Sequence, residues 1–382
     1  MAEEIHSSPP PLTPNLTEEE LLFRLRLLRS RRVGPATFNR LMHEHGTAAA
    51  ALEALADVAR DAGVKDYAPC PEGVALSELS AGRKAGARLL AQGTTLYPGA
   101  LNDLADAPPL IWALGDAALT CRPAVAIVGA RNASSLGLRM TRKLAVDLGN
   151  AGFTIVSGLA RGTDAAAHAA ALDTGTIAVM AGGVDVIYPT ENADLGAQVR
   201  ARGLMLSEQP MGLQPQARHF PRRNRLVSGL ARAVIVVEAA GKSGSLITAG
   251  LALDQGREVL AVPGHPFDGR ASGCNMLIRD GATLIRGAID VLEALGTPDA
   301  PTSPVVSPKA TKEPAAPAPV ITTGTEPIGA RILAQLSASP VAEDQLIRDL
   351  GLPPHVIAPE LTNLELDGRI ERHAGGMIAL PG

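Results

Sequence analysis

A glycine-rich turn at residues 129–137 carries residue types that bind anions. It follows the apolar run Ala124–Val128 and reads Gly-Ala-Arg-Asn-Ala-Ser-Ser-Leu-Gly before a helical pattern begins. Such a turn presents backbone N–H groups and a helix N-terminus to a phosphate. Arg131 adds a charged donor with two parallel N–H groups. The same glycines also suit a turn that only packs a strand against a helix.

The sequence argues against two common nucleotide sites. Arg131 stands where the dinucleotide fingerprint G-x-G-x-x-G has its second glycine, and no acidic residue ends the next apolar run, Thr154–Ser157, to hold a ribose. The chain also lacks G-x-x-x-x-G-K-[ST], the phosphate loop of Walker-type ATPases. The patterns therefore argue against NAD binding and against ATP hydrolysis of the Walker type.

A second anion-binding candidate is the most basic stretch of the chain, residues 215–225. It holds four arginines, an aromatic residue and an amide: Arg218, Arg222, Arg223, Arg225, Phe220 and Asn224. Arginines neutralise a phosphate backbone, and an aromatic ring stacks on nucleobases. The alternative interpretation is a solvated basic loop that pairs with surface acids.

Composition places these motifs in a chain of mixed charge. The 382 residues carry a net charge of −4, which gives no overall nucleic-acid signal, but residues 121–230 contain twelve Lys/Arg against seven Asp/Glu. No apolar run approaches a membrane span, and the start is polar, so we expect a soluble cytoplasmic protein. Cys70, Cys121 and Cys274 are isolated, which favours reduced, mostly buried thiols over a zinc site or disulfides.

The order of apolar segments predicts an α/β fold. Six short apolar runs alternate with helical patterns and begin near Val125, Thr154, Thr176, Leu204, Ala233 and Glu258. This alternation predicts a doubly wound, mostly parallel sheet. Ligands meet such sheets at the carboxyl ends of the strands, where the turn at 129–137 and the stretch Ser157–Gly162 lie.

Two smaller units flank the sheet domain, which we place at residues 96–297. Residues 1–17 are expected to be disordered, and residues 18–95 to form a helical domain that resembles a helix-hairpin-helix or sterile-alpha-motif unit. The Pro- and Ala-rich residues 298–326 read as a linker. Residues 327–382 predict a winged helix, whose third helix is acidic and therefore suits a protein contact better than a DNA groove.

Two weaker features lie near the expected ligand edge. Asp164 and His168 are four residues apart on one helix face, which suits a metal or acid–base pair but is more typical of a helix-capping aspartate beside an incidental histidine. Residues 242–245, Lys-Ser-Gly-Ser, open an apolar helix and form either a second anion-binding turn or an ordinary helix cap.

The ordered motifs resemble those of the DNA-processing protein A family, also called Smf. The matching residues are Ile127–Arg131 with Ser134 and Gly137, Ser157–Gly162 with Asp164 and His168, Gly182–Asp185 with Tyr188, Pro189, Glu191 and Asn192, Phe220–Arg225, Ser243–Ser245 with Thr248, and Val262–Gly264. They span the central domain. The flanking helical and winged-helix units fit the same family.

This resemblance implies a Rossmann-like domain that binds single-stranded DNA, forms a homodimer, protects incoming DNA and loads the RecA recombinase during natural transformation. It implies no catalytic residue, metal or cofactor and no membrane partner. By the motif match, the DNA-binding residues are Arg131, Phe220, Arg222, Arg223, Asn224 and Arg225, and the phosphate loops contain Gly129, Ser134, Gly158, Arg161, Gly162, Gly244 and Ser245.

Two other functions remain open at the level of the sequence. Glycine–serine loops with Glu238 on such a sheet edge also resemble lysine-decarboxylase-like nucleotide hydrolases, so a small-nucleotide enzyme or sensor is the main alternative. A scaffold that acts only through its terminal modules is the other. The stretch Phe220–Arg225 favours a DNA strand, because neither alternative needs it.

Overall fold

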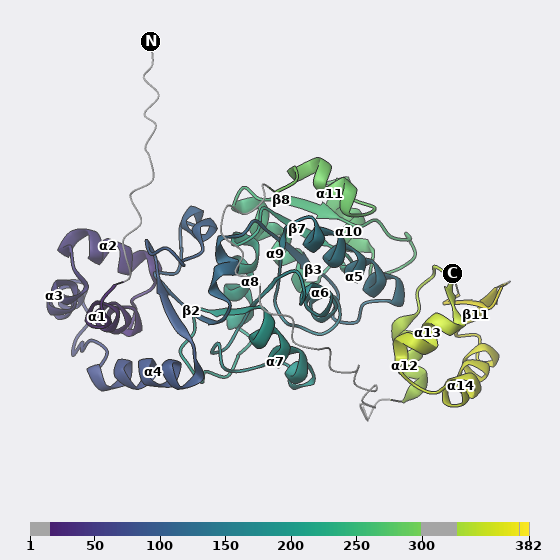
Figure 1. The fold of residues 1–382 in the computed structure, drawn as a ribbon, viewed down its shortest axis with the longest axis horizontal. Coiled ribbons are helices and arrows are strands. Elements are labelled where there is room, and N and C mark those ends of the chain that lie inside the picture. The colour runs from purple at the N-terminus through teal and green to yellow at the C-terminus, as the bar shows by residue number, and fades with distance from the viewer. Residues whose placement is uncertain (1–15, 299–326, 374, 382) are drawn as a thin grey trace, which may run out of the picture. The chain divides into compact units, whose positions relative to one another are not determined.

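The computed structural model describes residues 16–298, 327–373 and 375–381 of the chain (Figure 1). Apart from their end residues, the expected disordered N-terminus and the expected linker lie outside these ranges. The described residues fall into two compact units. The first contains residues 16–121 and 177–230, and the second contains residues 122–176 together with the described residues from Ala231 on.

The first unit begins with four helices. These are α1 (Glu18–Arg29), α2 (Pro35–His45), α3 (Ala48–Asp61) and α4 (Glu72–Ala85). Thr17 starts α1 because its Oγ1 accepts the Glu20 N–H at 3.1 Å. Phe38, Leu41 and Leu55 are among the buried residues between the first three helices. The expected helical domain is confirmed, but residues 88–91, near its expected end at residue 95, form a strand.

Four strands of the first unit lie in the order β1, β2, β6, β5. Their bounds are β1 Arg88–Ala91, β2 Leu110–Gly115, β5 Thr176–Val179 and β6 Leu204–Ser207. β5 and β6 are parallel, whereas β2 runs antiparallel to both β6 and β1. The unit also contains α7 (Ala193–Arg202), α8 (His219–Gly229) and the short 3-10 helices η1 (Gly99–Asp103), η2 (Ala117–Cys121) and η3 (Thr190–Asn192).

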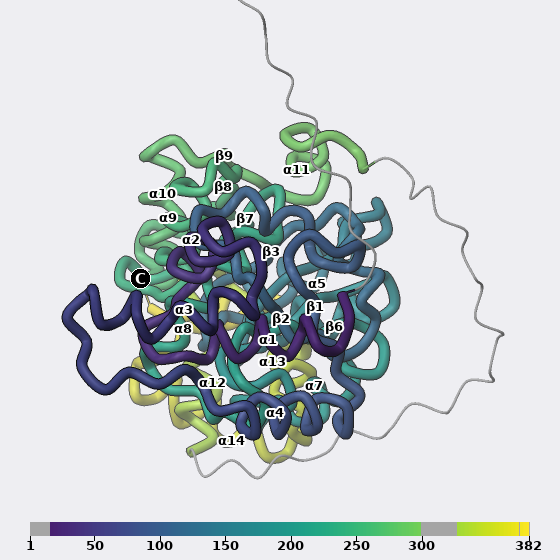
Figure 2. The backbone as a smooth tube through the Cα atoms, turned by 90° about the vertical axis from the view of Figure 1, so that its left-hand side faces the viewer, coloured from purple at the N-terminus to yellow at the C-terminus, as the bar shows by residue number. Residues whose placement is uncertain are grey.

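The second unit holds five parallel strands in the order β4, β3, β7, β8, β9. Their bounds are β3 Ala124–Val128, β4 Thr154–Ser157, β7 Ala233–Val236, β8 Glu258–Ala261 and β9 Thr283–Leu284. Figure 2 shows β3, β7, β8 and β9 as successive neighbours. The predicted apolar runs thus form strands in both units, and the mostly parallel α/β fold is confirmed.

Helices of the second unit bury the apolar strands. They are α5 (Ser135–Asn150), α6 (Thr163–Ala171), α9 (Gly244–Asp254), α10 (Ser272–Arg279) and α11 (Ala288–Leu295). α5 and α6 pack against each other (Figure 1), and Leu144, Leu148 and Phe153 join Ile127 and Ile155 in one buried cluster. Because β3, β4 and β7 are parallel, the loops that follow them leave the same edge of the unit.

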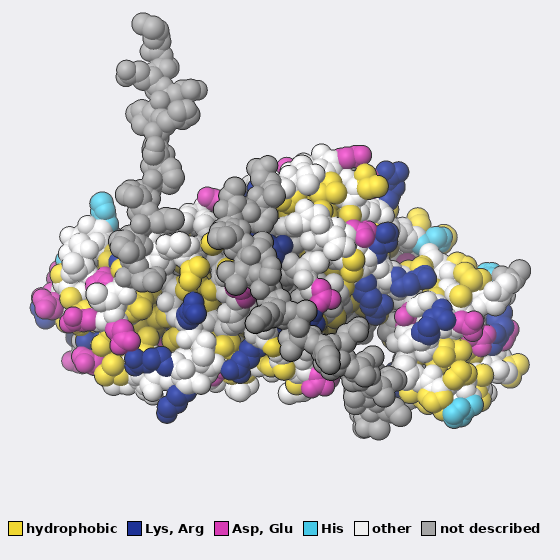
Figure 3. Space-filling model, viewed as in Figure 1, with side chains coloured by type: hydrophobic (Ala, Val, Ile, Leu, Met, Phe, Trp, Pro, Cys, Tyr) yellow, Lys and Arg dark blue, Asp and Glu magenta, His cyan; other side chains and the backbone are white. Residues whose placement is uncertain are grey.

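The C-terminal residues form the expected winged helix. Its helices are α12 (Ile328–Gln335), α13 (Glu343–Leu350) and α14 (Pro354–Leu366), and its strands are β10 (Val341–Ala342), β11 (Glu371–His373) and β12 (Met377–Ala379). α14 contains no Lys or Arg. Acidic and basic side chains intermix on the surface of this domain (Figure 3), and Arg372 pairs with Glu365 at 2.9 Å.

Candidate nucleic-acid interface

The loop between β3 and α5 carries one exposed arginine. The N–H groups at the start of the helix that follows are already hydrogen-bonded within the protein. Arg131 is exposed at this loop, whereas Ser134 is buried and caps α5, its Oγ accepting the Gly137 N–H at 3.0 Å. The Ser134 N–H donates to Glu238 Oε2 at 2.8 Å, and its hydroxyl donates to Oε1 at 2.5 Å. Glu238, just beyond β7, therefore occupies the place that an anion takes at a helix N-terminus.

Close approach of Glu238 explains the glycine at position 137. A Cβ there would lie 2.5 Å from the Glu238 carboxyl carbon, so a side chain would displace the carboxyl group. Burial raises the pKa of Glu238, while the two hydrogen bonds from Ser134 and the charge of Arg270 oppose that shift. The sequence predicted Ser134 as part of a phosphate loop, and the structure gives both of its donors to this internal carboxyl group.

The loop between β4 and α6 follows the same pattern. Its backbone N–H groups at Gly158 and Ala160 donate to Asp164 Oδ2 at 3.1 and 3.3 Å, and the Leu159 N–H donates to His168 Nε2 at 3.3 Å. Arg161 is exposed on the same loop. The predicted phosphate loop thus has three of its amide donors bonded within the protein and a guanidinium at its surface.

Two glycines allow the loops after β3 and β4 to touch. A Cβ on Gly129 would lie 2.5 Å from Thr163 Oγ1, and a Cβ on Gly162 would lie 2.3 Å from the Ala130 carbonyl oxygen. Gly162 also has a φ of +72°, which favours glycine. These contacts fix the loops that carry Arg131 and Arg161 against each other.

The loop between β7 and α9 is a helix cap. The hydroxyl oxygen of Ser243 accepts the Ser245 N–H at 3.3 Å, and the two serine hydroxyl groups lie 2.6 Å apart. Gly244 is exposed and has open space around its Cα. Of the two interpretations of residues 242–245, the ordinary cap accounts for the bonds that Ser245 makes here.

In the first unit, the basic stretch continues into helix α8 rather than remaining a loop. Residues from His219 on are helical, with Pro221 in the first turn, where its missing N–H costs no helix bond. Phe220 packs edge to face on Tyr188, with ring centroids 5.9 Å apart and an interplanar angle of 60°. Tyr188 is 48% exposed. The two rings form an aromatic pair at the surface beside exposed Arg218 and Arg222.

The other two arginines of α8 face inward. Arg223 is buried, and its guanidinium donates to the Val179 carbonyl at 3.1 Å. Arg225 pairs with Asp106 at 3.2 Å and with Glu208. Burial raises the pKa of Glu208, and the charge of Arg225 opposes the shift. Both arginines, which the motif match assigned to DNA, hold α8 in place in this structure; Asn224 is half-buried between them.

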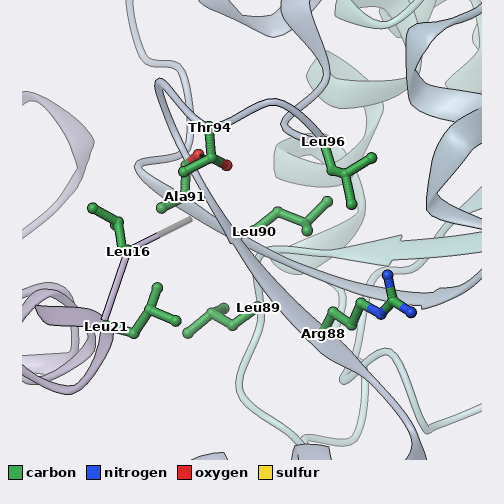
Figure 4. Close-up of a pocket in the computed structure, with 8 residues that line it drawn as sticks. All are labelled: Leu16, Leu21, Arg88, Leu89, Leu90, Ala91, Thr94 and Leu96. Atoms are coloured by element: carbon green, nitrogen blue, oxygen red, sulfur yellow. Dashed lines mark hydrogen bonds between the residues drawn. The ribbon is translucent and has the colours of Figure 1, made fainter. Parts of the chain in front are cut away.

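A separate cavity of about 330 Å³ lies beside β1 (Figure 4). It is lined by Leu16, Leu21, Arg88, Leu89, Leu90, Ala91, Thr94 and Leu96. Its lining is mostly apolar, with one cation, and therefore unlike a site for several phosphates. It takes no part in the candidate interface.

Neither a metal site nor a membrane-spanning helix occurs in the described parts of the chain. No group of three or more His, Cys, Asp or Glu side chains in them is arranged to hold a metal ion. None of their helices is long and apolar enough to cross a membrane. Cys70 and Cys274 are buried free thiols, as expected, but Cys121 is exposed.

Tyr188 and His168 have larger roles in the structure than their sequence patterns indicated. Tyr188 was quoted only as part of a motif, yet it contacts Phe220. The interpretation of Asp164 as a helix-start residue is consistent with its place in the first turn of α6, but His168 is not incidental. The spacing of four residues directly after a glycine loop is the signal that could have identified His168.

Comparisons with known proteins all indicate the same family. The family described as DNA recombination-mediator protein A matches residues 88–296, a DprA-like N-terminal HHH domain matches residues 18–81, and a DprA winged helix domain matches residues 311–376. DNA processing protein DprA of Streptococcus pneumoniae is 46% identical over 198 residues, which are 51% of this chain and 70% of that protein.

Two solved structures agree with this match. The X-ray structure of DprA from Streptococcus pneumoniae has a TM-score of 0.57 and 35% identity, covering 69% of this chain and 98% of that chain. DNA processing protein A from Helicobacter pylori, whose structure was described for its single-stranded DNA binding mode, has a TM-score of 0.51 and 33% identity, covering 55% and 95%. Because the central sheet and both flanking domains all match one kind of protein, the chain belongs to the DNA processing protein A (DprA/Smf) family.

Proposed function

We propose that this protein binds single-stranded DNA, with Arg131 and Arg161 as phosphate-binding side chains of the second unit. The observation that carries the proposal is the state of the two loops: their arginines are exposed, while neighbouring amide donors are bonded to Glu238, Asp164 and His168. Phosphate contact then depends on the guanidinium groups. The relative from Helicobacter pylori, described for its single-stranded DNA binding mode, supports the same ligand.

In the first unit, the proposed contacts are the aromatic pair of Phe220 and Tyr188, with Arg218, Arg222 and Asn224 on the same helical segment. Bases stack on exposed rings without strong sequence preference. Arg223 and Arg225 support the contact by holding α8, because their guanidinium groups bond to Val179 and to acidic side chains. The glycines and serines of the loops act by allowing close packing and by capping helices.

We further propose that the protein acts by binding and not by catalysis. It would protect incoming single strands and load the RecA recombinase in the cytoplasm, as a homodimer, during natural transformation and recombination. The family description, DNA recombination-mediator protein A, supports this role. A small-nucleotide enzyme is less well supported, because Glu238 already fills the anion position at the start of α5.

Binding of fluorescent oligothymidine and of a duplex of the same length, at several salt concentrations, tests the central proposal. We expect preference for the single strand, little dependence on sequence and a steep loss of affinity with salt, since neutralised phosphates release counterions. Equal affinity for the duplex would contradict single-strand binding. RecA filament formation on strands coated by a single-strand-binding protein tests the loading role separately.

A further inference from the structure

We infer that Asp164 and His168 are positioning residues for DNA binding, because their side chains fix the loop 158–162 that presents Arg161. The inference rests on the proposed function. Asp164 is 8% exposed and His168 is fully buried, so neither is placed to contact a strand itself. Their effect on DNA must pass through the loop that they hold.

Asp164 holds the first half of the strand-to-helix turn. One carboxylate oxygen, Oδ2, accepts the N–H groups of both Gly158 and Ala160. The residue between them, Leu159, is buried and has a φ of +56°, a backbone conformation that residues other than glycine rarely adopt. A loop that contains such a residue keeps its shape only where its surroundings fix it.

His168 fixes Leu159 through a chain of hydrogen bonds whose directions are all determined. The Leu159 N–H can only donate, so Nε2 of His168 carries no proton. Nδ1 therefore carries the proton and donates to Thr176 Oγ1 at 2.7 Å, and that hydroxyl donates onward to the Ile155 carbonyl at 2.9 Å. The neutral imidazole thus connects the Leu159 N–H to the Thr176 hydroxyl group and, through it, to the Ile155 carbonyl of β4.

The fixed loop in turn sets where Arg161 projects. Gly162, which follows it, lies against the backbone of Ala130 and Arg131, and the Thr163 N–H donates to the Ala130 carbonyl at 3.2 Å. Because both sides of Arg161 are held, its backbone has one position relative to Arg131. Loss of the acceptor on His168 would remove its hydrogen bond with the Leu159 N–H and weaken the first of these restraints.

Two substitutions at His168 separate positioning from packing. His168→Leu fills the same space without an acceptor, whereas His168→Gln offers an amide oxygen to the Leu159 N–H. We expect His168→Leu to weaken oligothymidine binding at least about fivefold and His168→Gln to bind within about twofold of the unsubstituted protein. Unchanged binding by His168→Leu, or equal losses in both variants, would overturn the inference.

Combination with Arg161→Ala distinguishes this inference from the function on which it rests. If His168 acts through Arg161, His168→Leu weakens binding much less in the Arg161→Ala background; additive losses would overturn the positioning role. Val291→Ala, a buried change in the same core but outside both loops, controls for lowered stability. If Arg131→Ala and Arg161→Ala both bind normally while folded, the proposed phosphate contacts themselves fail, whatever His168 does.

Discussion

The loops of the second unit and helix α8 of the first unit both carry arginines, but the two regions use them differently. Arg131 and Arg161 are exposed on loops whose backbone is bonded to internal acids and a histidine. In α8, Arg223 and Arg225 turn inward to a carbonyl and to carboxylates, while Arg222 stays exposed. A basic run in a sequence shows how many charges are present. Only the burial of each side chain shows which of those charges a phosphate can contact.

The largest expected effect tests this division within α8. Arg225→Ala removes the ion-pair partner of the Glu208 carboxyl group, which is largely buried, so we expect unfolding to become easier by about 3–5 kcal/mol. Arg222→Ala removes the same charge from the surface of the same helix and should change the free energy of unfolding by less than about 0.5 kcal/mol. Urea unfolding followed by circular dichroism measures both, and equal midpoints would refute the division.

Substitutions of the exposed arginines in the two loops should have the opposite effect: a large loss of DNA binding and little change in the free energy of unfolding. We expect Arg131→Ala and Arg161→Ala each to cost about 1.5–3 kcal/mol of DNA binding, as for a charge-assisted hydrogen bond. Each should lower the salt slope by about one contact. Lys143→Ala is the control, because it removes a charge from the exposed face of α5, where Lys143 pairs with Asp147. A loss of equal size in the control would mean that only overall charge matters.

An aromatic substitution sharpens the comparison within the first unit. Phe220→Ala should cost about 1–3 kcal/mol of binding by removing a stacking surface, yet leave the salt slope nearly unchanged, because no phosphate contact is lost. Phe267→Ala removes another aromatic side chain, which is 80% exposed in the second unit, and serves as the control. Fluorescence anisotropy at several salt concentrations gives both quantities. A reduced salt slope for Phe220→Ala would contradict stacking.

The smallest effect concerns the carboxyl group inside the β3–α5 loop. Because the pKa of Glu238 is raised in the folded protein above its ordinary value of 4.5, its contribution to stability is present below pH 4.5 and is lost as the pH rises through the folded-state pKa. Glu238→Gln removes this titration. Between pH 4.5 and neutrality, the free energy of unfolding of the unsubstituted protein should therefore fall relative to that of the variant. A difference that stays constant over this range would contradict a raised pKa.

Strand positions were predictable because their apolar runs are continuous. Ala124–Val128 and Ala233–Val236 are buried along their whole length, so their composition alone marks them. β1 was missed because it is only partly buried, follows a helix closely and pairs on one side with β2. Short edge strands leave little periodicity to detect.

The internal partners of the loops were not predictable from local patterns. Ser134 and Glu238 are 104 positions apart, and nothing in the intervening sequence ties one to the other. Likewise, the arginines in residues 222–225 look alike in the sequence, and only the helix geometry decides that Arg223 and Arg225 face inward. The sequence patterns located the loops and the basic segment. Which arginines are exposed and which face inward could be decided only from three-dimensional contacts.

Glu238 at the start of α5 has a consequence for selectivity among phosphate compounds. Inorganic phosphate and free nucleotides carry the same group as a DNA strand, and an open cradle of amide donors would bind them all. With that cradle filled by a carboxyl group, the binding we propose depends on Arg131 and Arg161, which lie on separate loops and each make only a weak contact with a single phosphate. A strand links its phosphates, so under this proposal the second contact forms at high effective concentration, and the polymer is expected to outcompete its own monomers.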